Sequence, residues 1–303
     1  MMQTMRPGLD SYVHFTPLHP HTTMFPLLDG LLASKMDKYD RYPLGPLEKR
    51  ISGADVIVYE SNSALFLTWK CWRLAPRARH IYRVSDDIRT LRSTPPRMVA
   101  LEKELAPKFS LISVPCVWLA QKFLELPNVR ILPHGVDKEV FDACKTNPYV
   151  PGTTNAVFCG LGFYDACSTH AMAVHCPGIN IHVVGLPAPK GDVPSNITYH
   201  DEIPFADTIP FIKYADCGLY TLLPSSRPMQ AYTDSLKVMQ YRYCGLPIVA
   251  PNFLDLHREG VFYYKPGDAA SCRAALIGAL QSGRNTAYAE EVHTWREVAE
   301  ALL

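Results

Sequence analysis

The sequence predicts an α/β protein built from two doubly wound domains, each with a parallel sheet. Its 303 residues exceed what one hydrophobic core of ordinary size accommodates. From Ala54 onward, short apolar runs alternate with helix-length segments, which is typical of strands joined by helical crossovers. The stretch 145–154 (KTNPYVPGTT) interrupts this alternation and is typical of a linker. We therefore expect an N-terminal domain at residues 1–147 and a C-terminal domain at residues 155–303.

The first domain has clear expected strands but an unusual beginning. Residues 1–50 contain several prolines and histidines, and they lack the clean strand and glycine-rich turn that usually open a doubly wound domain. We therefore expect this domain to be incomplete or atypical, either starting late or lacking its opening strands. Its strands are expected at 55–60, 80–84, 111–114 and 129–132, and its helices at 63–74, 95–105 and 117–124.

The second domain repeats the alternation after the linker. Open parallel sheets of this kind bind ligands beyond the carboxyl ends of their strands, so the residues that follow each strand are the first candidates for a site. Strands are expected at 156–159, 181–184, 197–200, 217–223 and 247–250, with helices at 205–214, 235–243 and 269–280.

Composition excludes several classes of protein. Hydrophobic residues make up 48% and charged residues 19%, as in globular chains. The net charge of +1 provides no overall field for nucleic acid, so no nucleic-acid partner is expected. The nine cysteines form no CxxC pair, which favours reduced thiols over disulfides or a zinc site. No apolar run of about 18 residues and no secretion signal are present, so we expect a cytoplasmic protein.

Polar residues and glycines follow four of the expected strands. Gly160-Leu161-Gly162 would let the backbone approach a phosphate, or it is a plain tight turn. Asp86 and Asp87 would supply a carboxylate base, or they cap the helix that follows. The pair His134-Gly135 is most simply a turn. The four segments are 60–63, 85–87, 133–137 and 160–162.

A fifth candidate lies on the helix expected at 235–243. Lys237 and Gln240 are three residues apart and therefore share one face of that helix. Ser235 lies at its start, where a hydroxyl, an ammonium and free backbone amides would together hold a diphosphate, with Gln240 one turn deeper near a sugar hydroxyl. The alternative is a solvated helix face. The apolar strand that follows the helix favours a buried face instead.

These segments resemble GT-B glycosyltransferases, and in particular the glucuronosyltransferases of bacterial xanthan assembly. DSLKVMQYRYCGLP (234–247) is similar to the nucleotide-sugar segment of that class, with Gln240 in place of the ribose-binding glutamate, as in the xanthan-type enzymes. The resemblance covers about residues 54–280 and implies two Rossmann-like domains. The other similar segments are ADVIVYES (54–61), YRVSDDI (82–88), HGVD (134–137) and EIPFADTIPFIKYA (202–215).

The resemblance implies a role for each candidate residue. Asp86 matches the general base that deprotonates the acceptor hydroxyl. Gly162 takes the place of a methionine at the donor site. The remaining residues match positions that contact the UDP part of the donor: Glu202, Tyr220, Ser235, Lys237 and Gln240. The implied reaction is an inverting transfer without a metal or other cofactor, in which Lys237 and helix amides stabilise the leaving diphosphate.

The resemblance also implies the substrates and their location. A UDP-sugar, with UDP-glucuronate expected, would donate its sugar to a lipid-linked oligosaccharide for exopolysaccharide assembly, at the inner face of the cytoplasmic membrane. The carboxylate of the donor sugar would need a cation, and three arginines are open candidates: Arg83, Arg89 and Arg227. Peripheral membrane contact is expected from this acceptor. Trp69, Trp72 and Trp118, beside Lys70, Arg73, Arg77 and Arg79, would form an interfacial patch, or they are core tryptophans beside a solvated basic turn.

Two other hypotheses remain open at this point. A UDP-sugar epimerase of the same architecture would act on the donor and would need no acceptor surface. A truncated, non-catalytic chain that binds a nucleotide or a protein partner would agree with the unusual N-terminus. The presence of Asp86 and Lys237 favours an enzyme.

Overall fold

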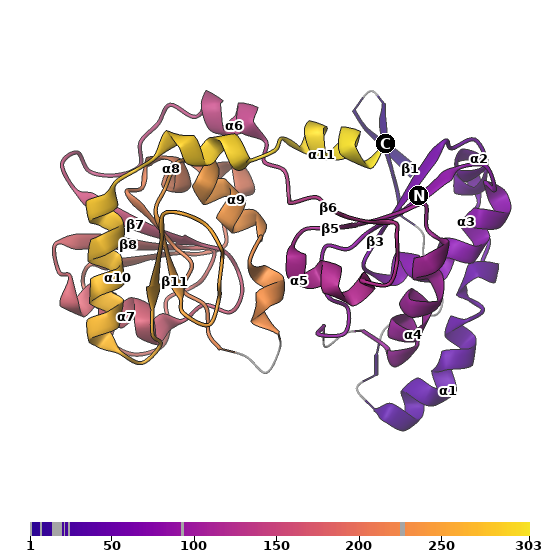
Figure 1. Ribbon diagram of the computed structural model, residues 1–303, viewed down its shortest axis with the longest axis horizontal. Coiled ribbons are helices and arrows are strands. Elements are labelled where there is room, and N and C mark those ends of the chain that lie inside the picture. The colour runs from indigo at the N-terminus through magenta and orange to yellow at the C-terminus, as the bar shows by residue number, and fades with distance from the viewer. Residues whose placement is uncertain are drawn as a thin grey trace. The chain divides into compact units, whose positions relative to one another are not determined.

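The computed structural model divides into two compact units, which Figure 1 shows in indigo to magenta and in pink to yellow. It describes residues 2–6, 8–13, 20, 22–23, 25–91, 94–224 and 228–303. Unit 1 comprises residues 1–132 and 302–303, and unit 2 comprises residues 133–301. Residues 133–147, which we expected in the first domain, therefore lie in unit 2, because Lys213 Nζ donates to the carbonyls of Phe141 and Cys144 at 2.6 and 2.9 Å.

The sheet of unit 1 is parallel, and its strands lie in the same order as in the chain. The strands are β3 (Val56–Glu60), β4 (Arg79–Arg83), β5 (Leu111–Val114) and β6 (Val129–Ile131). All four were expected from the sequence. Because the order never reverses, right-handed crossovers place the connecting helices on one face of the sheet.

The connecting helices of unit 1 are shorter than predicted. The expected helix at 63–74 is divided into a 3-10 helix and an α-helix, and the one at 117–124 is divided likewise. These elements are η2 (Ser63–Leu67), α3 (Thr68–Leu74), α4 (Pro96–Leu105), η3 (Ala106–Lys108), α5 (Val117–Ala120) and η4 (Gln121–Phe123).

The alternation of side chains on β4 shows how this sheet is covered. The Tyr82 ring packs between Phe109 and Phe123, with ring centroids 5.2 and 6.5 Å away, on the face that carries the crossovers. Ile81 points to the opposite face, where it clusters with Leu302. The last residues of the chain therefore help to close unit 1.

Among the first 50 residues, those that the structure describes add no strand to the parallel sheet of unit 1. A separate antiparallel hairpin is formed by β1 (Met2–Arg6) and β2 (Leu9–Tyr12). The helices are α1 (Pro26–Met36), η1 (Tyr39–Arg41) and α2 (Pro46–Ser52). The prediction of an atypical first domain is confirmed. These helices were missed, although a proline in the first turn of α1 and α2 is a signal for a helix start.

Unit 2 has a six-stranded parallel sheet in the order β12-β11-β10-β7-β8-β9. The sequence missed β12 and placed the end of β10 four residues too late, because the chain leaves the sheet at Tyr220. The strands are β7 (Thr154–Cys159), β8 (Ile179–Val184), β9 (Ile197–His200), β10 (Cys217–Leu219), β11 (Ile248–Pro251) and β12 (Val261–Tyr264).

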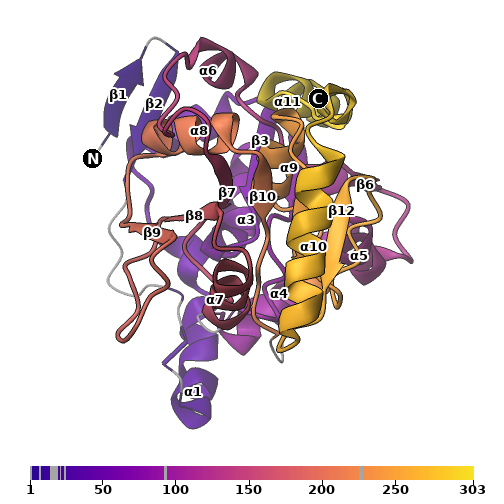
Figure 2. The same ribbon diagram turned by 90° about the vertical axis from the view of Figure 1, so that its left-hand side faces the viewer.

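Helices cover both faces of this sheet (Figure 2). Helices α7 (Ala166–His175) and α10 (Ala269–Ser282) pack together on one face, whereas α8 (Phe205–Tyr214) and α9 (Leu236–Tyr243) share the other. The direction of the crossovers reverses between β7 and β10, which are hydrogen-bonded neighbours. The remaining elements are α6 (Lys138–Ala143), η5 (Met229–Tyr232), η6 (Thr286–Glu291) and α11 (Trp295–Leu302).

No helix in the described ranges combines the length and the apolar character that a membrane span requires.

A pair of histidines lies on β8 and β9, under α8. His182 Nδ1 and His200 Nε2 are 3.2 Å apart, and Phe211 and Tyr149 pack against the rings. Desolvation, and then the charge of His200, lower the pKa of His182 to about 4. Desolvation also lowers the pKa of His200. The native fold therefore favours both rings in their neutral form.

We expect this pair to make unit 2 sensitive to acid. The unfolded chain binds protons to these histidines at a higher pH than the folded chain does, so stability falls as the pH drops from about 6.5 towards 4. His182→Gln should reduce the loss of melting temperature between pH 7.5 and pH 5, measured by differential scanning fluorimetry. His175→Gln, at an exposed position, is the matched control. An equal loss in all three proteins would contradict the prediction.

Candidate functional site

The carboxyl edge of the unit 2 sheet gathers most of the expected donor residues at one place. The chain order reverses between β7 and β10, and ligands of open α/β sheets bind at such a switch point. Gly160 follows β7, Tyr220 follows β10, and α9 begins close by with Ser235 as its N-cap. The topology alone therefore selects this edge as a candidate site.

Lys237 is the cation of this site. Its ammonium lies 3.8 Å from the centroid of the Phe158 ring and 5.4 Å from the centroid of the Tyr220 ring. Phe158 belongs to β7 and Tyr220 follows β10, so the ammonium sits over the switch point. Attraction between a cation and an aromatic face contributes about 0.5–2 kcal/mol.

The charge of Lys237 has no counter-ion among the residues that the structure describes. No described residue places a carboxylate or a hydrogen-bond acceptor on its ammonium. Desolvation lowers the pKa of Lys237 to about 8. A partly dehydrated cation of this kind gains more from an incoming anion than a solvated one does, because both interact in a lower dielectric.

Gly160 makes room for the Lys237 side chain. A Cβ atom on Gly160 would lie 2.6 Å from Lys237 Nζ, and the residue has a φ of +151°. Gly162, by contrast, is exposed and has open space around its Cα. The glycine that this loop requires is thus Gly160. The structure gives Gly162 no contact with the other candidates.

Ser235 and Gln240 lie on the same short helix as Lys237. Ser235 Oγ accepts a hydrogen bond from Val238 N at 3.5 Å and so caps α9, and its hydroxyl also hydrogen-bonds the Tyr220 side chain. Gln240 is buried, with 6% of its surface exposed. No described residue hydrogen-bonds its amide. The alternative of a solvated helix face is therefore wrong for Gln240.

Tyr220 and Glu202 are placed differently from each other. The Tyr220 hydroxyl donates to the carbonyl of Tyr232 at 2.7 Å, so its ring, and not its hydroxyl, lines the Lys237 position. Glu202 is exposed in the turn after β9, the edge strand of the sheet. It shares the carboxyl edge with Lys237, but two strand positions separate β9 from β7.

The glycine motif suggested a phosphate near the start of α7, but a side chain of the protein already caps this helix. Asp165 is its N-cap and accepts from Ser168 N at 3.0 Å. A groove of about 380 Å³ opens beside this helix start, lined mainly by apolar side chains. Its polar atoms include the Tyr199 hydroxyl, which is 3.3 Å from that of Tyr164 and 2.9 Å from His170 Nε2. Sequence reasoning had no signal for this groove.

Asp86 occupies the carboxyl edge of the unit 1 sheet, directly beyond β4. Its side chain is exposed, and no described residue pairs with its carboxylate. The surrounding protein still excludes enough water for desolvation to raise the pKa of Asp86. A free carboxylate with a raised pKa at a strand end is suited to accept a proton.

Asp87, the next residue, is fully paired. Arg89 donates to both of its oxygens at 2.7–3.1 Å, and Lys122 Nζ lies 3.2 Å away. Burial acts to raise the pKa of Asp87, but these hydrogen bonds and charges outweigh it and lower that pKa. Asp87 thus serves the structure, whereas Asp86 is free to react.

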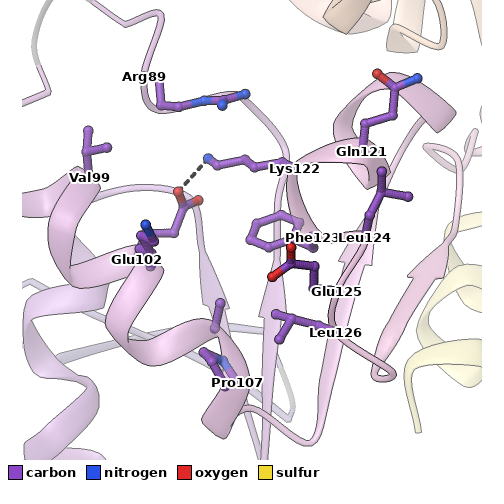
Figure 3. Close-up of a pocket in the computed structure, with 12 residues that line it drawn as sticks. Arg89, Val99, Glu102, Pro107, Gln121, Lys122, Phe123, Leu124, Glu125 and Leu126 are labelled. Atoms are coloured by element: carbon purple, nitrogen blue, oxygen red, sulfur yellow. Dashed lines mark ion pairs between the residues drawn. The ribbon is translucent and has the colours of Figure 1, made fainter.

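Lys122 joins Asp87 to a second buried carboxylate. Its ammonium contacts Glu102 of α4, as the dashed line in Figure 3 shows. Glu102 also accepts from the Tyr82 hydroxyl at 2.7 Å. The cluster borders a groove of about 580 Å³ between α4 and the segment that follows α5. Because Asp87 and Glu102 hold Arg89 and Lys122, two of the three cations that line this groove are neutralised, and Lys103 is the third.

The structure also places most of the other residues that the sequence suggested for the site. The Arg83 side chain pairs with Glu60 at 3.3 Å and Arg89 pairs with Asp87, whereas Arg227 lies outside the described residues. HGVD is structural, because a Cβ on Gly135 would lie 2.6 Å from the backbone nitrogen of Trp295.

The suggested tryptophan and basic patch is divided: Arg73, Arg77 and Arg79 are exposed, whereas Trp72 and Trp118 are half-buried. Lys70 is buried and pairs with Glu48. The Trp72 ring packs on His80 and Phe109, with centroids 5.6 Å away in both cases. The alternative of a core tryptophan beside a solvated basic turn therefore describes Trp72, but it does not describe Lys70, which is buried in an ion pair. Trp69 remains 37% exposed.

Comparisons with known proteins point to one class. Residues 1–115 match the family described as glucuronosyltransferase GumK, N-terminal domain. The UDP-glucuronate:glycolipid 2-beta-glucuronosyltransferase of Xanthomonas campestris pv. campestris is 29% identical over 283 residues, which are 91% of this chain and 69% of that protein.

Solved structures support the fold. Anabaena HepE in complex with UDP-glucose superposes with a TM-score of 0.60 at 14% identity, over 86% of this chain and 82% of HepE. Apo OtsA gives a TM-score of 0.53 at 14% identity, over 91% of this chain and 73% of OtsA. The fold is that of the GT-B class of glycosyltransferases. Over most of its length the sequence is similar to a GumK-type glucuronosyltransferase.

The contrast between Gly160 and Gly162 can be tested directly. In Gly160→Ala the new methyl group displaces the Lys237 ammonium into water, so the pH midpoint of Lys237 acylation should rise from about 8 towards the ordinary value for lysine. The unfavourable φ should also lower stability by about 1–3 kcal/mol. Gly162→Ala should leave both quantities unchanged. Peptide mass spectrometry and thermal melting provide the readouts, and an unchanged midpoint in Gly160→Ala would contradict the placement of Lys237.

Proposed function

We propose that this protein transfers glucuronic acid from UDP-glucuronate to a lipid-linked oligosaccharide, with inversion and without a metal ion. The observation that carries the proposal is an unpaired, dehydrated ammonium at the switch point of a GT-B sheet. A donor diphosphate is the anion that the position suits. UDP-glucuronate is the choice because it appears in the name of the Xanthomonas relative.

Unit 2 would hold the donor. The Lys237 ammonium and the first amides of α9 would bind the diphosphate, at the helix start that Ser235 caps. The buried amide of Gln240 would bond a ribose hydroxyl, one turn further along α9. Glu202 would contact the uridine from the end of β9, and the Tyr220 ring would keep Lys237 in place.

Unit 1 would activate the acceptor. Asp86 accepts the proton of an acceptor hydroxyl as the oxygen attacks the anomeric carbon. The bond between that carbon and the diphosphate oxygen breaks on the opposite side, so the configuration inverts. The electron pair leaves with UDP, and Lys237 neutralises part of the developing charge. This division of labour needs no Lewis acid, which is why we propose a metal-independent reaction.

The proposed acceptor places the protein at a membrane surface, at the cytoplasmic face. Helix α1 supports this part of the proposal, because three of its leucines are exposed: Leu27 by 86%, Leu28 by 47% and Leu31 by 72%. Lys35 and Lys38 follow on the same segment, and cations beside an apolar helix suit an anionic bilayer. The product would serve exopolysaccharide assembly.

The affinity for UDP should depend on the charge of Lys237. The pKa of Lys237 in the free protein is about 8, and the bound diphosphate favours the ammonium. Binding therefore requires proton uptake above pH 8, and the affinity should fall by up to about tenfold for each further pH unit. Isothermal titration calorimetry with UDP between pH 6.5 and 9.5 measures this dependence.

Two variants separate Lys237 from general effects of pH. Lys237→Met should bind UDP weakly and with no decline above pH 8. Lys265→Met, at an exposed position after β12, should behave as the wild type does. The assignment of Lys237 is excluded if the wild type and Lys237→Met show the same pH dependence.

Asp86 can be tested in the transfer reaction. With UDP-glucuronate and a polyprenyl-diphosphate oligosaccharide, Asp86→Asn should lower kcat by about 100-fold or more, because the amide cannot take the proton. The KM for the donor should stay within about twofold, since the donor contacts lie in unit 2. Mass spectrometry of the glycolipid product gives the rate and the mass of the transferred sugar.

Asp55→Asn is the matched control for this experiment, because Asp55 is an exposed aspartate at the opposite end of the same sheet. Undiminished transfer by Asp86→Asn would remove Asp86 from the role of base. Transfer of a neutral hexose in preference to glucuronic acid would change the donor and leave the reaction class intact.

A further inference from the structure

The carboxylate of Asp86 is unpaired, yet its backbone is held on both sides. On the C-terminal side, the neighbouring Asp87 is fixed by Arg89 and Lys122. On the N-terminal side, the contacts come from the end of β3. The loop is therefore anchored without any use of the Asp86 side chain itself.

Ser61 makes the contacts from β3. Its Oγ accepts hydrogen bonds from Ser85 N at 3.1 Å and from Asp86 N at 3.0 Å. Ser61 is 6% exposed, so these bonds are shielded from water. A hydroxyl oxygen has two lone pairs, and two backbone donors use both of them. Ser61 thus fixes the position of the Asp86 backbone just beyond the end of β4.

The sheet register explains why Ser61 is in position to do this. Strands β3 and β4 are parallel neighbours, and Glu60 pairs with Arg83. The residues that follow these two partners must therefore lie side by side at the carboxyl edge. Ser85 Oγ adds a hydrogen bond of 2.5 Å to Glu60 Oε2, which ties the two strand ends together a second time.

We infer that Ser61 is a positioning residue for the acceptor base, acting through the backbone of Ser85 and Asp86. The inference rests on the proposed function, because it assigns the purpose of the clamp to catalysis by Asp86. Removal of the hydroxyl frees two amides and lets the loop shift. A shift of about 1 Å in a catalytic group can reduce a rate by about 100-fold.

The first test is kinetic. Ser61→Ala should lower kcat by about 10- to 100-fold with an unchanged Kd for UDP, and Ser61→Thr, which keeps the acceptor oxygen, should restore most of the rate. The acidic limb of the pH–rate profile should also move to lower pH in Ser61→Ala. Desolvation is what raises the pKa of Asp86, and a loosened loop brings the carboxylate into water. A loss of structural support alone would lower the amount of active enzyme without moving that limb.

The second test needs no substrate. Hydrogen exchange of the peptide around residues 84–88 should be faster in Ser61→Ala than in the wild type, and the Ser61→Thr rate should be near that of the wild type. Ser63→Ala is the matched control, because Ser63 is two residues away and its hydroxyl makes no hydrogen bond to another described residue. It should change neither exchange nor kcat.

The possible outcomes distinguish the inference about Ser61 from the proposed function. Slower turnover, a moved acidic limb and faster local exchange in Ser61→Ala together support the inference. Normal kcat in Ser61→Ala, where Asp86→Asn is inactive, overturns the inference and leaves the proposed function intact. Full activity in Asp86→Asn overturns the inference and the role of Asp86 as base, because there is then no base to position, while the transfer itself is still demonstrated. Unchanged exchange in Ser61→Ala shows that the clamp does not hold the loop, and this result also overturns the inference.

Discussion

The ammonium of Lys237 lies against the face of Phe158 with no carboxylate among the described residues to neutralise it. A charge that loses water without gaining a partner costs free energy, and the aromatic face recovers only part of that cost. The depressed pKa of about 8 is the same imbalance expressed as proton affinity. An anion bound at this position would remove the imbalance, so the position is suited to an anionic ligand.

Unit 1 has the complementary arrangement. Asp86 is a carboxylate without a cation, whereas the adjacent Asp87 takes both Arg89 and Lys122. The two neighbours therefore have pKa shifts of opposite sign. Buried ion clusters contribute little net stability when their desolvation is included, but removal of one partner is costly. The network around Asp87 is accordingly better understood as a rigid support for the loop than as a source of stability.

The sequence was sufficient for the parts of the fold that depend on periodicity. Four strands of unit 1 and the helix at 235–243 were predicted because apolar runs and turn residues mark them. It was insufficient where local signals are weak. β12 contains two tyrosines and little alternation, and α7 has three alanines among its ten residues and no run of large apolar side chains to mark an apolar face. The domain boundary was placed too late because Lys213, far along the chain, fixes residues 141–144.

The candidate site is likewise predictable only in part, because the sequence gives the residues but not the partners that surround them. Neither aspartate caps a helix, because α4 begins only at Pro96: Asp87 accepts from Arg89 N at 3.1 Å within a turn, and no described residue pairs with the carboxylate of Asp86. A sequence cannot assign these roles, because they depend on where Lys122 and Ser61 lie after folding. Likewise, no pattern distinguishes Gly160 from Gly162 until the Lys237 side chain is placed. Candidate residues can thus be found by motif, but their chemical state is set by partners that are distant in sequence: for Asp86, a serine on the next strand and a lysine 36 positions further along the chain.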